Sequence, residues 1–233
     1  MTAGKRIIMP SAFNELFLAV SLPLLLMFAI GPPALANVAP ESPAVNLEKP
    51  EGALLSAVKR GDVESARLLL QQGADPDTRA TDRYRRSAMI LATISKDLDM
   101  VELFLESGAS VNLQDSEGLT ALSWAALRGY TKIAKLLLDN NADVDLADKQ
   151  QVSPLLYAIG TDNRELTVWL LGLGADPNVV STENKMTPLL LAIESNKRYF
   201  VELLLNSGAD ANGTNGDGYS PLMSAAESGD AQS

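Results

Sequence analysis

Cysteine and histidine are both absent from this chain of 233 residues. Without cysteine there is no thiol nucleophile, no cysteine-bound zinc and no disulfide bond. Without histidine, serine–histidine–aspartate chemistry and imidazole metal sites are excluded as well. Carboxylates, lysine, tyrosine, serine and threonine remain as the groups available for catalysis. The sequence therefore predicts neither a metal site nor a cofactor.

Positive charge is also scarce. The chain has 19 Lys+Arg against 29 Asp+Glu, which gives a net charge of −10. Because binding to nucleic acid needs cations that face the phosphates, this balance argues against a nucleic-acid partner. With 46% hydrophobic and 21% charged residues, the composition is otherwise that of a globular protein.

The N-terminal residues 1–36 have the pattern of a secretory signal peptide. Lys5 and Arg6 supply the positive start, and residues 16–30 form an uncharged apolar run. A Gly-Pro-Pro break follows, and Ala34-Leu35-Ala36 is the small-residue pattern of a cleavage site. The sequence therefore predicts cleavage between Ala36 and Asn37, only transient membrane contact, and a periplasmic or secreted protein.

The alternative is an uncleaved anchor in the inner membrane formed by residues 16–30. A spanning helix needs about 20 apolar residues, and this run is shorter and ends in two prolines. Residues 37–46 then read as an extended linker, since they contain prolines and lack a helical period.

Two motifs recur with one period through the rest of the chain. The tripeptide Gly-Ala-Asp or a close variant returns every 33 to 35 residues and begins at Gly73, Gly108, Asn141, Gly174 and Gly208. Each copy follows a leucine-rich cluster such as ARLLLQQ or VELLLNS. The second motif reads SAMILA at 87–92, TALSWA at 120–125, SPLLYA at 153–158, TPLLLA at 187–192 and SPLMSA at 220–225.

These phased motifs resemble those of ankyrin-repeat proteins, whose unit runs Thr-Pro-Leu-His-x-Ala, then a helix, then Gly-Ala-Asp. The resemblance covers residues 47–233 and implies an all-α solenoid of helix-turn-helix units joined by β-hairpin loops. The family's histidine is replaced in every unit, which is a structural substitution. The units are about 47–79, 80–114, 115–147, 148–180, 181–214 and an incomplete 215–233. We expect the chain to fray after about residue 228.

The physical chemistry of each unit agrees with this resemblance. Serine or threonine before the first helix can cap its free N–H groups, and proline suits its first turn. Glycine, or Asn141 once, suits the left-handed position that ends the second helix. Trp124 and Tyr157 stand just before the repeat alanine, where burial between neighbouring first helices is expected.

Arginines gather around Tyr84 in residues 79–86 of this acidic chain. Seven residues, 80–86, precede Ser87, whereas five precede Thr120 in the next unit, so this loop carries an insertion of two. By the resemblance, loops and first helices line a concave surface that binds partners. The predicted binding positions at its basic end are Lys59, Arg60, Arg79, Arg83, Tyr84, Arg85, Arg86, Leu127 and Arg128. The corresponding C-terminal positions are acidic or aromatic: Glu183, Glu194, Asp217, Tyr219 and Glu227.

We expect a binding protein without catalytic activity, whose protein partner places an acidic segment against the arginines. The alternative for the arginines is a solvated loop neutralised by nearby aspartates. Other possible functions are an envelope inhibitor or immunity protein that blocks a toxic enzyme, and a structural spacer that associates with itself. A carboxylate-dependent glycan hydrolase would need paired acids in a cleft, whereas the acids here follow the repeat.

Overall fold

The computed structural model describes residues 50–183 and 185–227, which belong to one compact unit, Leu47–Ser233. The predicted signal peptide, the linker and the chain beyond residue 227 lie outside this description. Within the described ranges, no helix combines the length and apolar character needed to cross a membrane.

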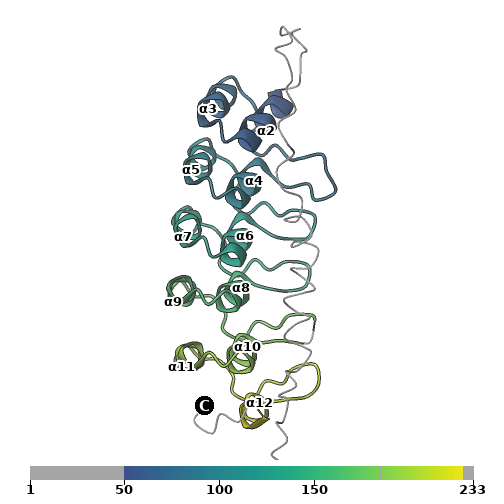
Figure 1. Cartoon of the computed structure of the whole chain (residues 1–233), viewed down its shortest axis with the longest axis vertical. Coiled ribbons are helices and arrows are strands. Elements are labelled where there is room, and N and C mark those ends of the chain that lie inside the picture. The colour runs from purple at the N-terminus through teal and green to yellow at the C-terminus, as the bar shows by residue number, and fades with distance from the viewer. Residues whose placement is uncertain (1–49, 184, 228–233) are drawn as a thin grey trace, which may run out of the picture. The chain divides into compact units, whose positions relative to one another are not determined.

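Paired helices stack in two columns along this unit (Figure 1). The inner helices lie next to the loops and contact one another in order: α2 (Pro50–Arg60), α4 (Ala88–Ile94), α6 (Ala121–Arg128), α8 (Pro154–Gly160), α10 (Pro188–Glu194) and α12 (Pro221–Glu227). The outer helices are α3 (Val63–Gln71), α5 (Leu98–Glu106), α7 (Thr131–Asp139), α9 (Arg164–Gly172) and α11 (Arg198–Asn206). The described unit is thus the predicted solenoid of helix pairs.

Hydroxyl caps start the inner helices, as predicted. The side chains of Ser87, Thr120, Ser153 and Thr187 each accept a hydrogen bond from the backbone N–H three residues later. Proline occupies the first turn of α8 and α10. Both features satisfy or remove N–H groups that would have no partner inside the helix.

Residues in the left-handed conformation follow the outer helices, which confirms the second expectation. Gly73, Gly108, Gly174 and Gly208 have φ between 78° and 93°, and Asn141 has φ 63° at the equivalent place. The chain can therefore turn sharply into the next loop after each helix pair.

The core lies between the helices, mainly along the inner column. Inner helices of seven or eight residues bring neighbouring units close together. Trp124 and Tyr157 are 2% and 7% exposed, so their predicted burial is confirmed. The positions that hold histidine in the family's consensus are filled in the four central units by buried Ile90, Ser123, Leu156 and Leu190.

The loops between units are short turns, and the described ranges contain no extended strand pair. An isolated antiparallel bridge joins Arg79 to Ser87. Elsewhere an acceptor side chain holds the turn: Asp115 accepts from the N–H groups of Glu117 and Leu119, at 2.9 and 3.0 Å. The predicted β-hairpins are therefore stabilised by aspartate or asparagine more than by a strand ladder.

A second set of side-chain hydrogen bonds joins each unit to the next. Asp77, Asn112, Asp145 and Asn178 accept from a backbone N–H of the following unit, on Ser110, Asp143, Asp176 and Asp210 respectively. The donor–acceptor distances are 2.7, 2.9, 3.0 and 2.7 Å. The same kind of junction thus repeats four times along the stack.

Candidate protein-interaction surface

The arginine loop, residues 79–86, owes its shape to one aspartate and one backbone bond. Asp82 Oδ1 accepts from the N–H groups of Tyr84 and Arg85, both at 3.0 Å. The N–H of Ala80 donates to the carbonyl of Arg86 at 2.8 Å and closes the base of the loop. The tip is fixed to the next loop because the N–H of Ser116 donates to the Tyr84 carbonyl at 2.8 Å.

Arg79 binds within the protein, although the sequence suggested a role at the surface. Its Nη1 donates to the carbonyls of Arg85 and Gln114, at 3.1 and 2.7 Å. The half-buried side chain therefore links two successive loops. Its guanidinium therefore holds these two loops together through hydrogen bonds to their backbone carbonyls.

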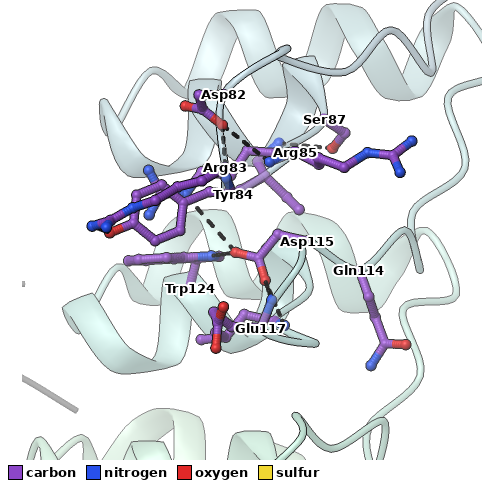
Figure 2. A network of polar contacts seen from close by, with 12 residues as sticks. Asp82, Arg83, Tyr84, Arg85, Ser87, Gln114, Asp115, Glu117 and Trp124 are labelled. Atoms are coloured by element: carbon purple, nitrogen blue, oxygen red, sulfur yellow. Dashed lines mark hydrogen bonds and ion pairs between the residues drawn. The ribbon is translucent and has the colours of Figure 1, made fainter. Parts of the chain in front are cut away.

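Arg86 is buried, which corrects its predicted place among exposed binding residues. Its side chain is only 9% exposed, and its guanidinium carbon lies 4.2 Å from the Tyr84 ring centroid and 4.9 Å from that of Trp124. The Nε atom is 3.8 Å from Asp115 Oδ2. Figure 2 shows Tyr84 lying over Trp124, with Asp115 beside them.

The reason for this burial is the position of Arg86 in the repeat. Its carbonyl closes the loop base in the same way as those of Leu119, Val152 and Met186 in the later units. Those three apolar side chains are at most 8% exposed. Arg86 thus occupies an inward-facing position, and its place directly before Ser87 was the signal that sequence reasoning missed.

Asp115 connects this loop to the inner helix below it. Its Oδ2 accepts from Trp124 Nε1 at 3.0 Å, while Oδ1 binds the two backbone N–H groups of its own turn. Asp148 repeats the pattern one unit later, where it accepts from the Tyr157 hydroxyl at 2.5 Å. Burial raises the pKa of Asp148, although the bonds from Tyr157 and two backbone amides act in the opposite direction.

Sequence reasoning did not identify these aspartates as partners of the aromatic residues. In both units, the aromatic residue that donates to the aspartate stands nine positions after it. That shared spacing, together with an aromatic residue in a short inner helix, was the sequence signal from which these hydrogen-bonded pairs could have been predicted.

The other predicted residues at the basic end differ in exposure. Arg83 and Arg85 are exposed, and Tyr84 is half-buried beneath the Arg83 guanidinium, 4.5 Å from the ring centroid. Lys59 and Arg60 are exposed at the end of α2, and Arg60 lies 3.8 Å from Asp62. Leu127 and Arg128 are half-buried at the end of α6. Charged groups at this end therefore reach solvent from two successive units.

The predicted acidic end also has exposed charge. Glu183 and Asp217 are exposed, and Tyr219 is 40% exposed. Glu194 is half-buried and accepts from Asn215 Nδ2 at 3.3 Å. Burial and the nearby Asp217 raise the pKa of Glu194, while that hydrogen bond lowers it. The side chain of Glu227 lies outside the described part of the chain.

Comparison with known families identifies the fold. The family described as "Ankyrin repeats (3 copies)" matches this chain three times, at residues 31–115, 96–181 and 155–233. The chain therefore belongs to the ankyrin-repeat family. Repeats of this family are generally binding scaffolds without catalytic activity.

Several curated proteins match part of the sequence. An ankyrin repeat-containing protein of Treponema pallidum is 39% identical over 75 residues, which are 32% of this chain and 24% of that protein. The B-cell lymphoma 3 protein homolog of Mus musculus is 36% identical over 107 residues, 46% of this chain and 23% of that protein. The chain thus spans about a quarter of the length of each relative, and the likeness supports the repeat scaffold.

Proposed function

We propose that this ankyrin-repeat chain is a periplasmic scaffold without enzymatic activity, which binds a protein partner through its loops and inner helices. An acidic segment of the partner lies against the basic end, formed by Lys59, Arg60, Arg83 and Arg85. One observation carries the proposal. These cations are exposed toward one end of the stack, and the acids Glu183 and Asp217 are exposed toward the other.

The charge asymmetry supports binding because this acidic protein repels acidic partners elsewhere on its surface. Arginine is favoured in binding hot spots, and its planar guanidinium pairs well with carboxylates. Exposed charge pairs also accelerate association in a salt-dependent manner. Partner capture should accordingly weaken as the salt concentration rises.

Charge reversal tests the proposal directly. The full chain and its Arg83→Glu/Arg85→Glu variant would each be used to capture proteins from an envelope extract. The matched control is Lys132→Glu/Arg164→Glu, which makes the same charge change at two exposed positions on outer helices. We expect a specific protein to be lost only with the loop variant. Equal capture by all three proteins would refute the proposed surface.

Export is tested separately from binding. Mass spectrometry of the protein recovered from a periplasmic extract should show Asn37 as its first residue. An intact chain found in the membrane fraction would instead favour the anchor formed by residues 16–30.

A spacer that associates with itself is a second candidate, favoured by one observation. Leu222 and Met223 of α12 are 75% and 57% exposed, whereas the equivalent Leu155 and Leu156 of α8 are buried. Stacking of a second copy on α12 would cover these side chains. A molar mass that rises with protein concentration in light scattering, and not in a Leu222→Glu variant, would support this function.

A further inference from the structure

We infer that Arg86 forms the centre of a carboxylate-binding site at the junction of the arginine loop with α6. Its ligand is the carboxylate of an aspartate or glutamate side chain in a peptide segment of the partner. The inference deepens the proposed function and rests on it, because it assigns the recognition of acidic groups to one buried side chain.

Arg86 occupies a position where its sister units have apolar residues. Leucine, valine and methionine fill the equivalent place in the three following units and are buried there. Burying a guanidinium instead costs free energy unless its hydrogen-bonding groups find partners. An arginine at this position is therefore a departure from the other units that folding of the repeat does not require.

The hydrogen-bonding capacity of Arg86 is largely unused. Asp115 is its one ionic partner among the described residues, and 3.8 Å is too long for a hydrogen bond. The Nε atom is enclosed and has no hydrogen-bond acceptor in that part of the chain. No hydrogen-bond acceptor contacts the two terminal nitrogens in the described residues either, and the side chain keeps 9% of its surface exposed. Two adjacent donors thus remain available to an external acceptor.

Two aromatic rings hold the guanidinium in place. Tyr84 and Trp124 both lie within 5 Å of its central carbon, at 4.2 and 4.9 Å. The rings are themselves fixed, since Ser116 binds the Tyr84 backbone and Asp115 binds the Trp124 indole. Stacking on aromatic faces leaves the edge of a guanidinium free to donate. A side chain restrained in this way loses little further entropy on binding.

The surrounding charge favours an anion. Arg83 lies 4.5 Å and Arg86 4.2 Å from the Tyr84 centroid, so two guanidiniums share this ring. Asp115 is the carboxylate within this group, and both its oxygens already accept hydrogen bonds. A second carboxylate would match the planar fork of Arg86 and neutralise the excess charge. The net charge of −10 disfavours a polyanion such as nucleic acid.

Tryptophan fluorescence provides a direct binding assay. The chain has two tryptophans, so a Trp169→Phe background leaves Trp124 as the single reporter, next to Arg86. The probe is the peptide acetyl-Ala-Glu-Ala-Glu-Ala-amide, and the control is the same peptide with glutamine in place of glutamate. A third peptide, the glutamine sequence with a free C-terminal carboxylate, distinguishes a chain terminus from side chains as the source of the carboxylate.

The variants distinguish the two-donor edge of the Arg86 guanidinium from positive charge alone as the cause of binding. Arg86→Leu recreates the apolar position of the sister units and should keep the fold, as circular dichroism would verify. Arg164→Leu is the control, an exposed arginine on the outer helix α9 and away from the basic end, and Arg86→Lys retains charge without the planar guanidinium. Loss of a charge-assisted hydrogen-bond pair should weaken binding of the glutamate peptide about tenfold or more in both Arg86 variants. Arg164→Leu should change it by less than about twofold.

The inference is overturned if the glutamine peptide binds equally well, if the free C-terminal carboxylate is preferred, or if Arg164→Leu and Arg86→Leu weaken binding alike. Failure of the peptide assay with successful partner capture by the arginine loop would refute this site and leave the proposed function intact. Saturable peptide binding through Arg86 without any captured protein would support the site and count against the scaffold function.

Discussion

At the scale of single residues, buried polar contacts fasten the loops to the inner helices. Trp124 and Tyr157 occupy the same place in successive units, and each donates to the aspartate that shapes the preceding loop. A hydrogen bond to a buried carboxylate is worth more than an exposed one, because its loss leaves a charge without solvent. These contacts are therefore sensitive points for stability.

Tyr157→Phe tests this role by removing one hydroxyl with little change in shape. The Asp148 carboxylate would lose a donor inside the protein, so we expect the free energy of unfolding to fall by about 1.5 to 3 kcal/mol. Tyr219→Phe is the control, because Tyr219 is 40% exposed and should change stability by less than about 0.5 kcal/mol. Urea unfolding of both variants would measure the difference, and equal effects would contradict a special role for the buried pair.

Stability should also respond to pH through Asp148. Burial raises its pKa in the folded state, so the folded protein binds this proton more tightly than the unfolded chain does. The associated stability is present below the unfolded pKa of about 4, and it is lost as the pH rises through the folded pKa. In urea titrations across this range, wild type should lose stability relative to Asp148→Asn as the pH increases. A constant difference between the two would contradict the raised pKa.

At the scale of the loops, close packing between units limits the choice of residue. A Cβ atom added to Gly118, which has φ 87°, would lie 2.8 Å from the backbone nitrogen of Lys149. The equivalent Gly218 has φ 82° and nothing within 4 Å of the same position. The two glycines therefore share a backbone conformation and differ in what surrounds them.

Alanine at these two glycines separates conformational cost from packing cost. Gly218→Ala should destabilise by about 1 to 2 kcal/mol, since it pays only for the left-handed conformation. Gly118→Ala should cost about 1 to 3 kcal/mol more, because the loops must also move apart. Thermal or urea unfolding would measure both. A Gly118→Ala variant as stable as Gly218→Ala would show that the loops separate freely.

The sequence predicted the helix pairs well, and the loops only in part. Hydroxyl caps and the left-handed residues after helices are local signals, which is why Ser87, Thr120 and Asn141 could be assigned without a structure. The orientation of Arg86 depends on contacts with Tyr84 and with Trp124 of the next unit, and no local pattern encodes them. The charge asymmetry was visible in the sequence, and the place of Arg86 before Ser87 indicated its burial, whereas its stacking on Tyr84 and Trp124 required the three-dimensional structure.

At the scale of the whole repeat stack, stability comes from contacts between neighbouring units. Leu155 is fully buried between such neighbours, and the equivalent Leu222 is 75% exposed. Leu155→Ala should therefore lower the free energy of unfolding by about 2 to 5 kcal/mol. Leu222→Ala should change it by less than about 0.5 kcal/mol. Comparable losses in chemical denaturation would mean that Leu222 is covered in solution, as self-association would produce.

The repeated side-chain junction between units also bears on how such an array changes length. Each of the four junctions described above uses an aspartate or asparagine that accepts from a backbone N–H 31 to 33 residues later. Excision of residues 115–147 would place Asn112 opposite the N–H that Asp145 now serves, on Asp176. The two units brought together by the excision could therefore form the same hydrogen bond without any further substitution. We therefore expect loss or duplication of a whole unit to preserve these junctions, so that recombination can change the length of the stack by one unit at a time.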